Sequence, residues 1–368
     1  MNRLLLLGFA LFATAPSLAQ PTLPPDSAQA PAPDPLTFYG FVDSYYGYDF
    51  RAAPTRDRPG FLYSHDRQNE FTINNVLLGI RYQTEQVRGA VGLQAGSYVA
   101  ANYAAEDPVL RPIYEAYAGF RPFRKAWLDV GIFASHIGFE SALSKDNWTL
   151  SRSLMAENSP YFESGARLTY EIGPQLTLTG LVLNGWQNIR ETNQSKAVGT
   201  QLQWKPTDKI VLNSSTFYGN EQPQDSVRRR RYFHNFYVSY VATHRHSLAV
   251  VFDIGQQEAG VRGVRADTWH SSAAFVRYQL TEKWTAALRA EYYHAERGVI
   301  ITSLQPAATD ENVTLKGASL TLDYAPSSHM LVRVEGRLLG AGQGLFPQRA
   351  AALSDHYGNV TGSIALSF

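Results

Sequence analysis

The sequence predicts an all-β protein, a transmembrane antiparallel β-barrel of about 16 strands with short periplasmic turns and long external loops. Strand-like segments of ten residues or more run along the chain, short and long links alternate between them, and the last nine residues form a strand with one apolar face. A tilted transmembrane strand needs about 9 to 11 residues, whereas the strands of a soluble β-sandwich average about 5 or 6. Segment length therefore favours a membrane barrel over a sandwich.

The N-terminus has the features of an export signal. Asn2 and Arg3 give a basic start, Leu4–Ala13 is an apolar stretch too short to span a membrane, and Ser17-Leu18-Ala19 has small residues at the cleavage positions. The chain contains no cysteine, so burial or a closed hydrogen-bonded sheet must hold the exported fold together. We therefore expect a signal peptide over residues 1–19, a Pro-rich N-terminal linker over 20–35 and a barrel in the bacterial outer membrane over 36–368.

The candidate strands have the composition of β-structure. Aromatic residues reach 12% of the chain and Tyr alone numbers 21, which suits the aromatic girdles of a barrel at both membrane interfaces. Because strand boundaries read from a sequence shift by a few residues, about 14 or about 18 strands are alternatives. The candidate strands cover residues 36–50, 69–84, 87–103, 112–122, 126–138, 161–172, 175–188, 196–205, 209–220, 231–243, 246–257, 267–281, 283–297, 312–325, 329–340 and 356–368.

Two kinds of link alternate between these strands. The short links contain the turn-forming residues Pro, Gly, Asp and Ser. Short turns at one rim and long loops at the other are the layout of an outer-membrane barrel. The long links cover residues 51–68, 104–111, 139–160, 189–195, 221–230, 258–266, 298–311 and 341–355.

Charged and apolar side chains alternate along several of these strands. In the strand 329–340, Val332 and Val334 lie on one face, whereas Arg333 and Glu335 lie on the other. A charge that faces lipid at mid-depth costs about 2–4 kcal/mol, so we expect the charged faces to point into a lumen too wide for side chains to fill. The candidate pore-lining residues are Arg167, Glu171, Arg277, Arg289, Glu291, Arg333, Glu335 and Arg337.

The C-terminal strand supports the same topology. It is expected to pair with the first strand, which begins near Leu36, because a barrel in lipid leaves no open edge. The aromatic Phe368 at the end of the chain resembles the signal that bacterial outer-membrane proteins present to their assembly machinery, so it is the candidate assembly signal. The residues expected to face lipid are Val360, Ile364, Leu366 and Phe368, and those expected to face the lumen are Thr361, Ser363 and Ser367.

The longest link, residues 139–160, carries both charged and apolar side chains. A loop of this length is uncommon unless it packs on the protein or has a function. Two interpretations stay open: an inward fold that narrows the lumen, and a lid over the outer mouth. In an inward fold its charges would set ion selectivity, whereas in the simpler interpretation they are solvated loop charges. The candidate constriction residues are Glu140, Lys145, Asp146, Arg152 and Glu157.

Four segments carry a resemblance to a known family. They are Tyr39–Tyr46, His136–Thr149, Ala156–Tyr161 and Leu183–Gln187. Through them the chain, from the first strand to the C-terminus, resembles the OmpL-like β-barrel porins of Gram-negative outer membranes. The resemblance implies an outer-membrane β-barrel with a passive channel role, and it brings no residue-level mechanism.

The expected function is therefore passive diffusion of small hydrophilic solutes or ions through a water-filled lumen. Two alternatives stay open: a lipase- or protease-type enzyme on the barrel, and a closed structural barrel filled by its loops. No metal site or cofactor is predicted, because the His residues lack metal-ligand spacing. The Gly-x-Ser-x-Gly motif is absent, but a barrel hydrolase does not need it, so the enzyme alternative stays open with no catalytic residue named.

The expected partners follow from this location. They are outer-membrane lipid and lipopolysaccharide, the barrel assembly machinery and small hydrophilic solutes, and a homo-oligomer is an alternative to a monomer. A net charge of +1 at pH 7, with no basic domain, gives no indication of a nucleic-acid partner.

Overall fold

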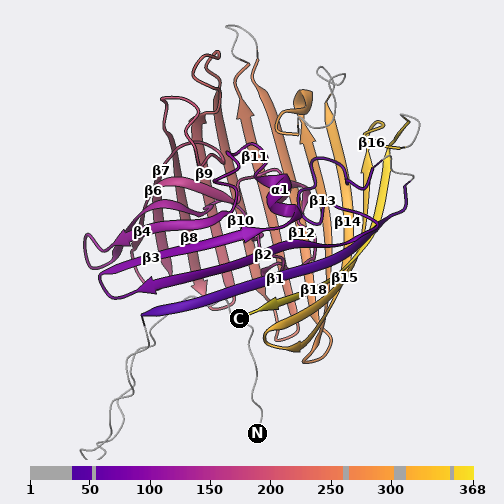
Figure 1. Ribbon diagram of the computed structural model, residues 1–368, viewed down its shortest axis with the longest axis horizontal. Coiled ribbons are helices and arrows are strands. Elements are labelled where there is room, and N and C mark those ends of the chain that lie inside the picture. Colours follow the sequence, from indigo (N-terminus) through magenta and orange to yellow (C-terminus); the bar gives the residue numbers. More distant parts are fainter. Residues whose placement is uncertain (1–34, 52–54, 260–264, 302–311, 349–351) are drawn as a thin grey trace, which may run out of the picture. The chain divides into compact units, whose positions relative to one another are not determined.

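The computed structural model describes residues 35–51, 55–259, 265–301, 312–348 and 352–368. The expected signal peptide and nearly all of the Pro-rich linker lie outside the described residues. Sixteen antiparallel strands close into one barrel (Figure 1). They are β1 (Leu36–Asp49), β2 (Phe71–Gln83), β3 (Val87–Ala95), β4 (Ile113–Phe120), β5 (Ala126–Ala134), β6 (Phe162–Glu171), β7 (Leu176–Leu183), β8 (Ala197–Thr207), β9 (Ile210–Asn220), β10 (Arg230–Val241), β11 (His246–Gln257), β12 (Asp267–Gln279), β13 (Trp284–Ala295), β14 (Val313–Ser327), β15 (Met330–Ala341) and β18 (His356–Ser367).

The barrel closes between its first and last strands. β18 pairs with β1 over the register from Phe41 opposite Ser367 to Asp49 opposite Asn359, and β15 pairs with the other side of β18. The predicted strand number and the closure of the last strand on the first are both confirmed. A separate two-stranded sheet, β16 (Phe346–Pro347) and β17 (Leu353–Ser354), occupies the predicted long link 341–355.

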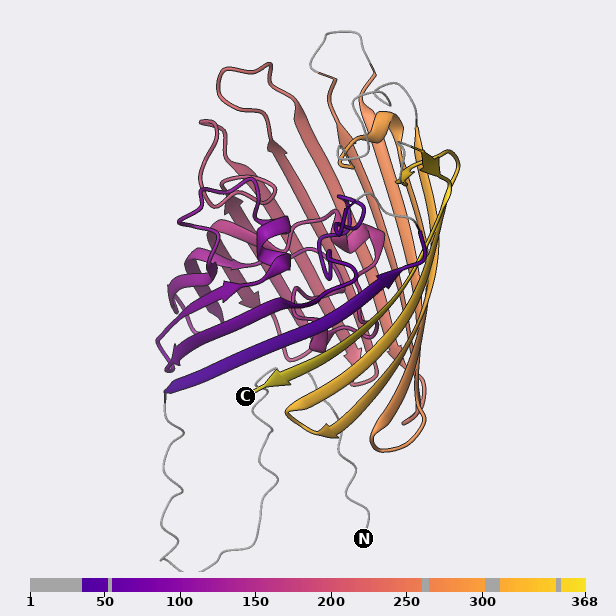
Figure 2. The ribbon, with the colours of Figure 1, turned by 45° about the vertical axis from the view of Figure 1, so that its right-hand side comes forward.

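One predicted strand is partly wrong. The segment 87–103 stays in the sheet only as far as Ala95, and the helix α1 (Ser97–Asn102) follows. Gly96 has a φ of 139°, a conformation open mainly to glycine, and it turns the chain out of the ladder. The wall is short on this side, because β3 to β7 have 8–10 residues whereas the other barrel strands have 11–15 (Figure 2).

Side chains alternate between the two faces of the wall as period-two strands require. In β11 every second side chain from Leu248 to Ile254 is exposed, and the side chains between them are buried. In β18 the residues expected to face lipid are exposed, whereas Thr361 and Ser363 are buried. The exposed apolar face is the surface that lipid would cover.

The interior holds both side chains and parts of the external links. A buried apolar cluster joins Phe61 and Leu154 from two of these links to strand residues such as Phe217 and Trp269. The short helix α2 (Leu154–Glu157) contacts β12 and β13, and two single turns of 3-10 helix cover Ser144–Asp146 and Glu296–Gly298. No helix of the described chain is long and apolar enough to cross a membrane.

Candidate channel interior

Residues 139–160, here called the inner loop, lie inside the barrel. Backbone amides of the loop donate to carboxylates on the wall: Leu150 N lies 2.9 Å from Glu335 Oε2, and Leu154 N lies 2.6 Å from Glu291 Oε2. Hydrogen bonds to ionised carboxylates are among the strongest in proteins. The loop therefore folds into the barrel and not over its outer mouth, and its role as a constriction stays a prediction.

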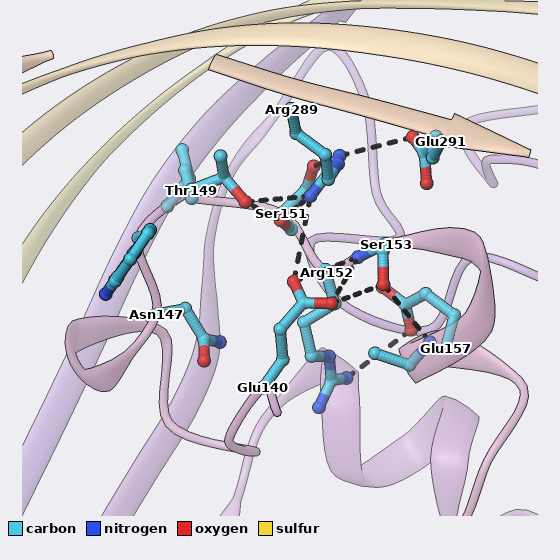
Figure 3. Close-up of polar contacts among 12 residues, drawn as sticks. Glu140, Asn147, Thr149, Ser151, Arg152, Ser153, Glu157, Arg289 and Glu291 are labelled. Carbon is cyan, nitrogen blue, oxygen red and sulfur yellow. Dashed lines mark hydrogen bonds and ion pairs between the residues drawn. The ribbon is translucent and has the colours of Figure 1, made fainter. Parts of the chain in front are cut away.

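Two arginines of the wall also bind the inner loop, and here the wall donates the hydrogen bonds and the loop accepts them. Arg333 on β15 donates to the carbonyl of Ser144 at 2.5 Å and pairs with Asp323, its Nε lying 2.7 Å from Oδ1. Arg289 on β13 donates to Thr149 Oγ1 at 2.8 Å (Figure 3). Both guanidinium groups are buried, so neither faces bulk water.

Three of the five predicted constriction residues are also buried. The guanidinium of Arg152 lies 3.9 Å from the ring centroid of Tyr161 and pairs with Glu157 at 3.4 Å (Figure 3). The carboxylate of Glu140 accepts from the Ser153 amide at 3.1 Å. Burial raises the pKa of Glu140 above its ordinary value. These three charges stabilise the fold of the inner loop and do not meet bulk solvent.

The other two predicted constriction residues are exposed. Lys145 and Asp146 pair with each other at 3.4 Å, and their side chains are 33% and 40% exposed. Leu143, two residues before Lys145, and Tyr114 on β4 both pack against a buried cluster that includes Leu77 on β2. The exposed tip of the inner loop therefore faces the β2–β4 side of the lumen.

The first long link also enters the barrel and is tied to the inner loop. Glu157 accepts from the amide of Tyr63 at 3.0 Å. On β1, the buried carboxylate of Asp43 accepts from Ser144 Oγ at 2.7 Å and lies 3.0 Å from His65 Nε2. Two links that are far apart in sequence thus share polar contacts inside one lumen.

The wall from β2 to β6 has a different charge arrangement. Arg88 and Arg167 both pair with Asp129, their Nη2 atoms lying 2.6 and 2.9 Å from Oδ2. Arg81 pairs with Glu115 at 3.0 Å. The Asp129 side chain is fully buried, whereas the side chains of Arg81, Arg88 and Arg167 are 51%, 20% and 21% exposed. On this wall the carboxylates are buried, whereas the arginine side chains are partly exposed to water.

The structure therefore divides the predicted pore-lining residues into two groups. All eight occupy inward positions of their strands, but five of them are buried and three keep contact with solvent. The buried five are Arg289, Glu291, Arg333, Glu335 and Arg337, and the other three are Arg167, Glu171 and Arg277.

Three exposed or half-buried cations in the lumen, Arg81, Arg88 and Lys205, are absent from the sequence prediction. The signal for them was the same alternation that identified Arg167. Arg81, for example, lies between Ile80 and Tyr82, whose side chains face outward and are exposed.

The C-terminal residue completes the sheet. The backbone amide of Gly40 donates to the carbonyl of Phe368 at 2.9 Å, and the aromatic ring covers Gly40 on the outer face. The assembly-signal role of Phe368 stays a prediction. In the described part of the chain, no group of three His, Cys, Asp or Glu side chains is placed to hold a metal ion.

Comparisons with solved structures reveal the same barrel in outer-membrane proteins. The chain is similar to OmpT of Vibrio cholerae (TM-score 0.59, 9% identity, 93% of this chain and 100% of that one). It is also similar to the channel DcaP of Acinetobacter baumannii (TM-score 0.61, 12% identity, coverage 90% and 97%) and to an anion-selective porin from Comamonas acidovorans (TM-score 0.57, 8% identity, coverage 90% and 99%). At these identities the likeness shows a shared fold.

The family comparison covers the whole barrel. Residues 35–368 match the family described as putative beta-barrel porin-2, OmpL-like. The comparison with curated proteins found no significant match. The match from the first strand to the C-terminus and the closed antiparallel sheet point to one conclusion: this chain belongs to the OmpL-like β-barrel porin family of the bacterial outer membrane.

Proposed function

We propose that the protein lets small hydrophilic solutes diffuse passively across the outer membrane, along the part of the lumen that the inner loop leaves open. The observation that carries this proposal is the solvent exposure of inward-facing charged side chains. An inward-facing side chain contacts solvent only where the lumen holds water, and a barrel of this width holds water wherever chain does not fill it. The residues concerned are Arg81, Arg88, Arg167, Glu171, Lys205 and Arg277.

In this proposal the predicted site residues take two roles. Arg167, Glu171 and Arg277 line the passage, and Lys145 and Asp146 are the inner-loop charges that a solute meets. The five buried wall residues hold the inner loop instead. Four of them contact the loop directly and Arg337 pairs with Glu291, which supports this division, because a group already bonded to protein is not available to a passing solute.

The proposed partners are lipid and lipopolysaccharide around the apolar outer face, and the assembly machinery at Phe368. Deletion of Phe368 should lower the yield of assembled barrel without changing the unit conductance of the barrels that do form. A homo-oligomer is also proposed, since one similar OmpT structure is described as a trimer form. Sedimentation of the purified barrel in detergent measures that state, and a monomer at all concentrations would reject it.

The channel function is tested by single-channel recording in planar bilayers. Stepwise currents through the full chain are expected. If the wild type passes no current but an Arg333→Gln variant with a loosened inner loop does, the barrel is closed by its loop at rest. If neither conducts at any voltage, the protein is a structural barrel.

One observation favours an enzyme enough to need its own test. Ser214 Oγ on β9 lies 2.8 Å from His234 Nε2 on β10, and both side chains occupy outward positions. A catalytic serine needs a histidine that a third group orients. No hydrogen bond to His234 Nδ1 is present in the described part of the chain. The test measures cleavage of phospholipid and of peptide by the wild type, with the Ser214→Ala variant as control. We expect no cleavage by the wild type. Cleavage that is lost in the variant would support the enzyme alternative.

A further inference from the structure

We propose that Arg81, Arg88 and Arg167 form a binding subsite for anionic solutes, small molecules that carry a carboxylate or phosphate group. The proposal rests on the channel function and deepens it by naming the solute class, because a solute reaches these side chains through the lumen. The three arginines lie on the inward face of β2, β3 and β6, and each side chain is at least partly exposed.

One carboxylate holds Arg88 and Arg167 in place. Four residues lie side by side on the neighbouring strands β3 to β6. In order they are Arg88, Gly119, Asp129 and Arg167, each opposite the next in the strand register. Arg88 reaches across Gly119 and binds both oxygens of Asp129, with Nε–Oδ1 and Nη2–Oδ2 distances of 2.7 and 2.6 Å. A Cβ atom at Gly119 would collide with that carboxylate. The bidentate pair therefore depends on a residue without a side chain.

Arg81 is held in a similar way by β1 and β4. Its guanidinium lies 4.4 Å from the ring centroid of Tyr39, and its Nε donates to Glu115 Oε1 at 3.0 Å. The Tyr39 hydroxyl donates to the same carboxylate. Tyr39 crosses β2 at Gly79, where a Cβ atom would collide with the phenol ring. Stacking and pairing together orient a guanidinium whose side chain is half exposed.

The three guanidinium groups bind their carboxylates through the same edge. Each uses Nε and Nη2 on its carboxylate, and Nη1 of Arg81, Arg88 and Arg167 has no hydrogen-bond partner in the described part of the chain. Three cations stand against two carboxylates, and the carboxylates of Glu115 and Asp129 are 6% and 0% exposed. The three arginines and their two paired carboxylates therefore carry a net charge of +1, with the carboxylates shielded from the solute.

The chemistry of guanidinium specifies the class of ligand. Its N–H donors match the geometry of carboxylate and phosphate oxygens, and it offers no acceptor to a cation. Oriented donors also bind more tightly than mobile ones, because less side-chain entropy is lost when the ligand arrives. The competing explanation, that the arginines only stabilise the short wall, predicts a loss of stability without any change in ion preference.

Reversal potentials in a KCl gradient test the subsite in the full-length barrel. One variant is Arg81→Gln, and the second is Arg88→Gln/Arg167→Gln/Asp129→Asn. The Asp129→Asn change is included because the carboxylate would otherwise be buried without a partner. The control is Lys209→Gln/Arg228→Gln, which neutralises two exposed cations outside the lumen. The wild type and the control should prefer chloride, and both subsite variants should shift the reversal potential toward cations.

Direct binding of inorganic phosphate separates this proposal from the channel function. A phosphorus NMR titration of the barrel in detergent should show binding that weakens roughly tenfold in each subsite variant, as expected for the loss of a charge-assisted hydrogen bond. Conduction with neither chloride preference nor phosphate binding would overturn the subsite and leave the channel standing. Phosphate binding that the variants weaken, in a barrel that passes no current, would support the subsite and reject the channel. Unchanged binding and selectivity in both variants would also overturn the subsite.

Discussion

The two sides of the lumen use arginine in opposite ways. On β13 and β15, Arg289 and Arg333 are buried and donate to the inner loop, whereas on β2 and β3, Arg81 and Arg88 lie over buried carboxylates and face solvent. Both walls consist of antiparallel strands with arginines on the inward face. The difference arises because the arginines of one wall bind the inner loop, whereas those of the other wall pair with carboxylates of neighbouring strands. An inward orientation therefore does not by itself make a charged residue part of the passage.

The energetics of the two walls differ for the same reason. Removal of one partner from a buried ion pair leaves an uncompensated charge and costs about 3–5 kcal/mol. An exposed pair contributes about 0–1 kcal/mol, because water screens it. Equivalent substitutions on the two walls should thus have unequal effects on folding and on conduction.

The largest effect is expected for Arg333→Gln. The change leaves Asp323 buried without its cation and removes two donors to the inner loop. We expect the free energy of unfolding to fall by about 3–5 kcal/mol and the inner loop to become accessible to protease. Urea unfolding in lipid vesicles and limited proteolysis measure the two outcomes.

The matched variant on the other wall is Arg81→Gln. Arg81 is half exposed, but the variant leaves the buried Glu115 carboxylate with the Tyr39 hydroxyl as its partner, so the free energy of unfolding should fall by about 1–3 kcal/mol, less than for Arg333→Gln. Equal destabilisation by the two variants would break the comparison between the walls.

For Gly119→Ala we again expect a smaller effect than for Arg333→Gln. The new Cβ atom collides with the Asp129 carboxylate and separates it from Arg88. We expect a loss of about 1–3 kcal/mol, typical of overpacking, together with a weaker preference for anions. The control is Gly180→Ala on β7, where a Cβ atom would meet open space. Equal stability of the two variants would show that Arg88 does not depend on the gap at Gly119.

The smallest effect is expected for Glu140→Gln, in the pH dependence of stability. Burial raises the pKa of Glu140, with Arg289 and Ser153 opposing the shift and Glu291 adding to it. The folded carboxyl therefore holds its proton more tightly than the unfolded one, and its contribution to stability is complete at low pH and declines as the pH rises through the raised value. In the Glu140→Gln variant the free energy of unfolding should not show this decline with rising pH. Urea unfolding over a pH series measures it, and parallel curves would contradict the assignment.

Much of the fold was predictable from local patterns. The sixteen strands and the outward faces of β11 and β18 follow from alternation with period two, which each segment carries in its own residues. The exception, residues 97–102, forms a helix after Gly96 because a backbone turn ends the pairing there. A local pattern of suitable residues does not reveal whether a neighbouring strand is still present to pair with them.

The candidate site was predictable only in part. The inward orientation of Arg167 and Arg333 follows from the same alternation, and the same rule applied to Arg81 and Arg88 would have added them. The sequence could not distinguish the covered arginines from the exposed ones. That distinction depends on where the inner loop lies after the barrel has closed.

By itself the sequence determined the class of protein, the strand number and the face of the wall on which each strand residue lies. These properties are local, because a strand's side-chain period and the cost of a charge in lipid act on each segment separately. Only the tertiary structure decided that Arg333 binds the inner loop and that Arg81, Arg88 and Arg167 face water. That outcome rests on contacts between residues far apart in the chain, such as Ser144 with Arg333 and Asp129 with Arg88, which no segment encodes alone.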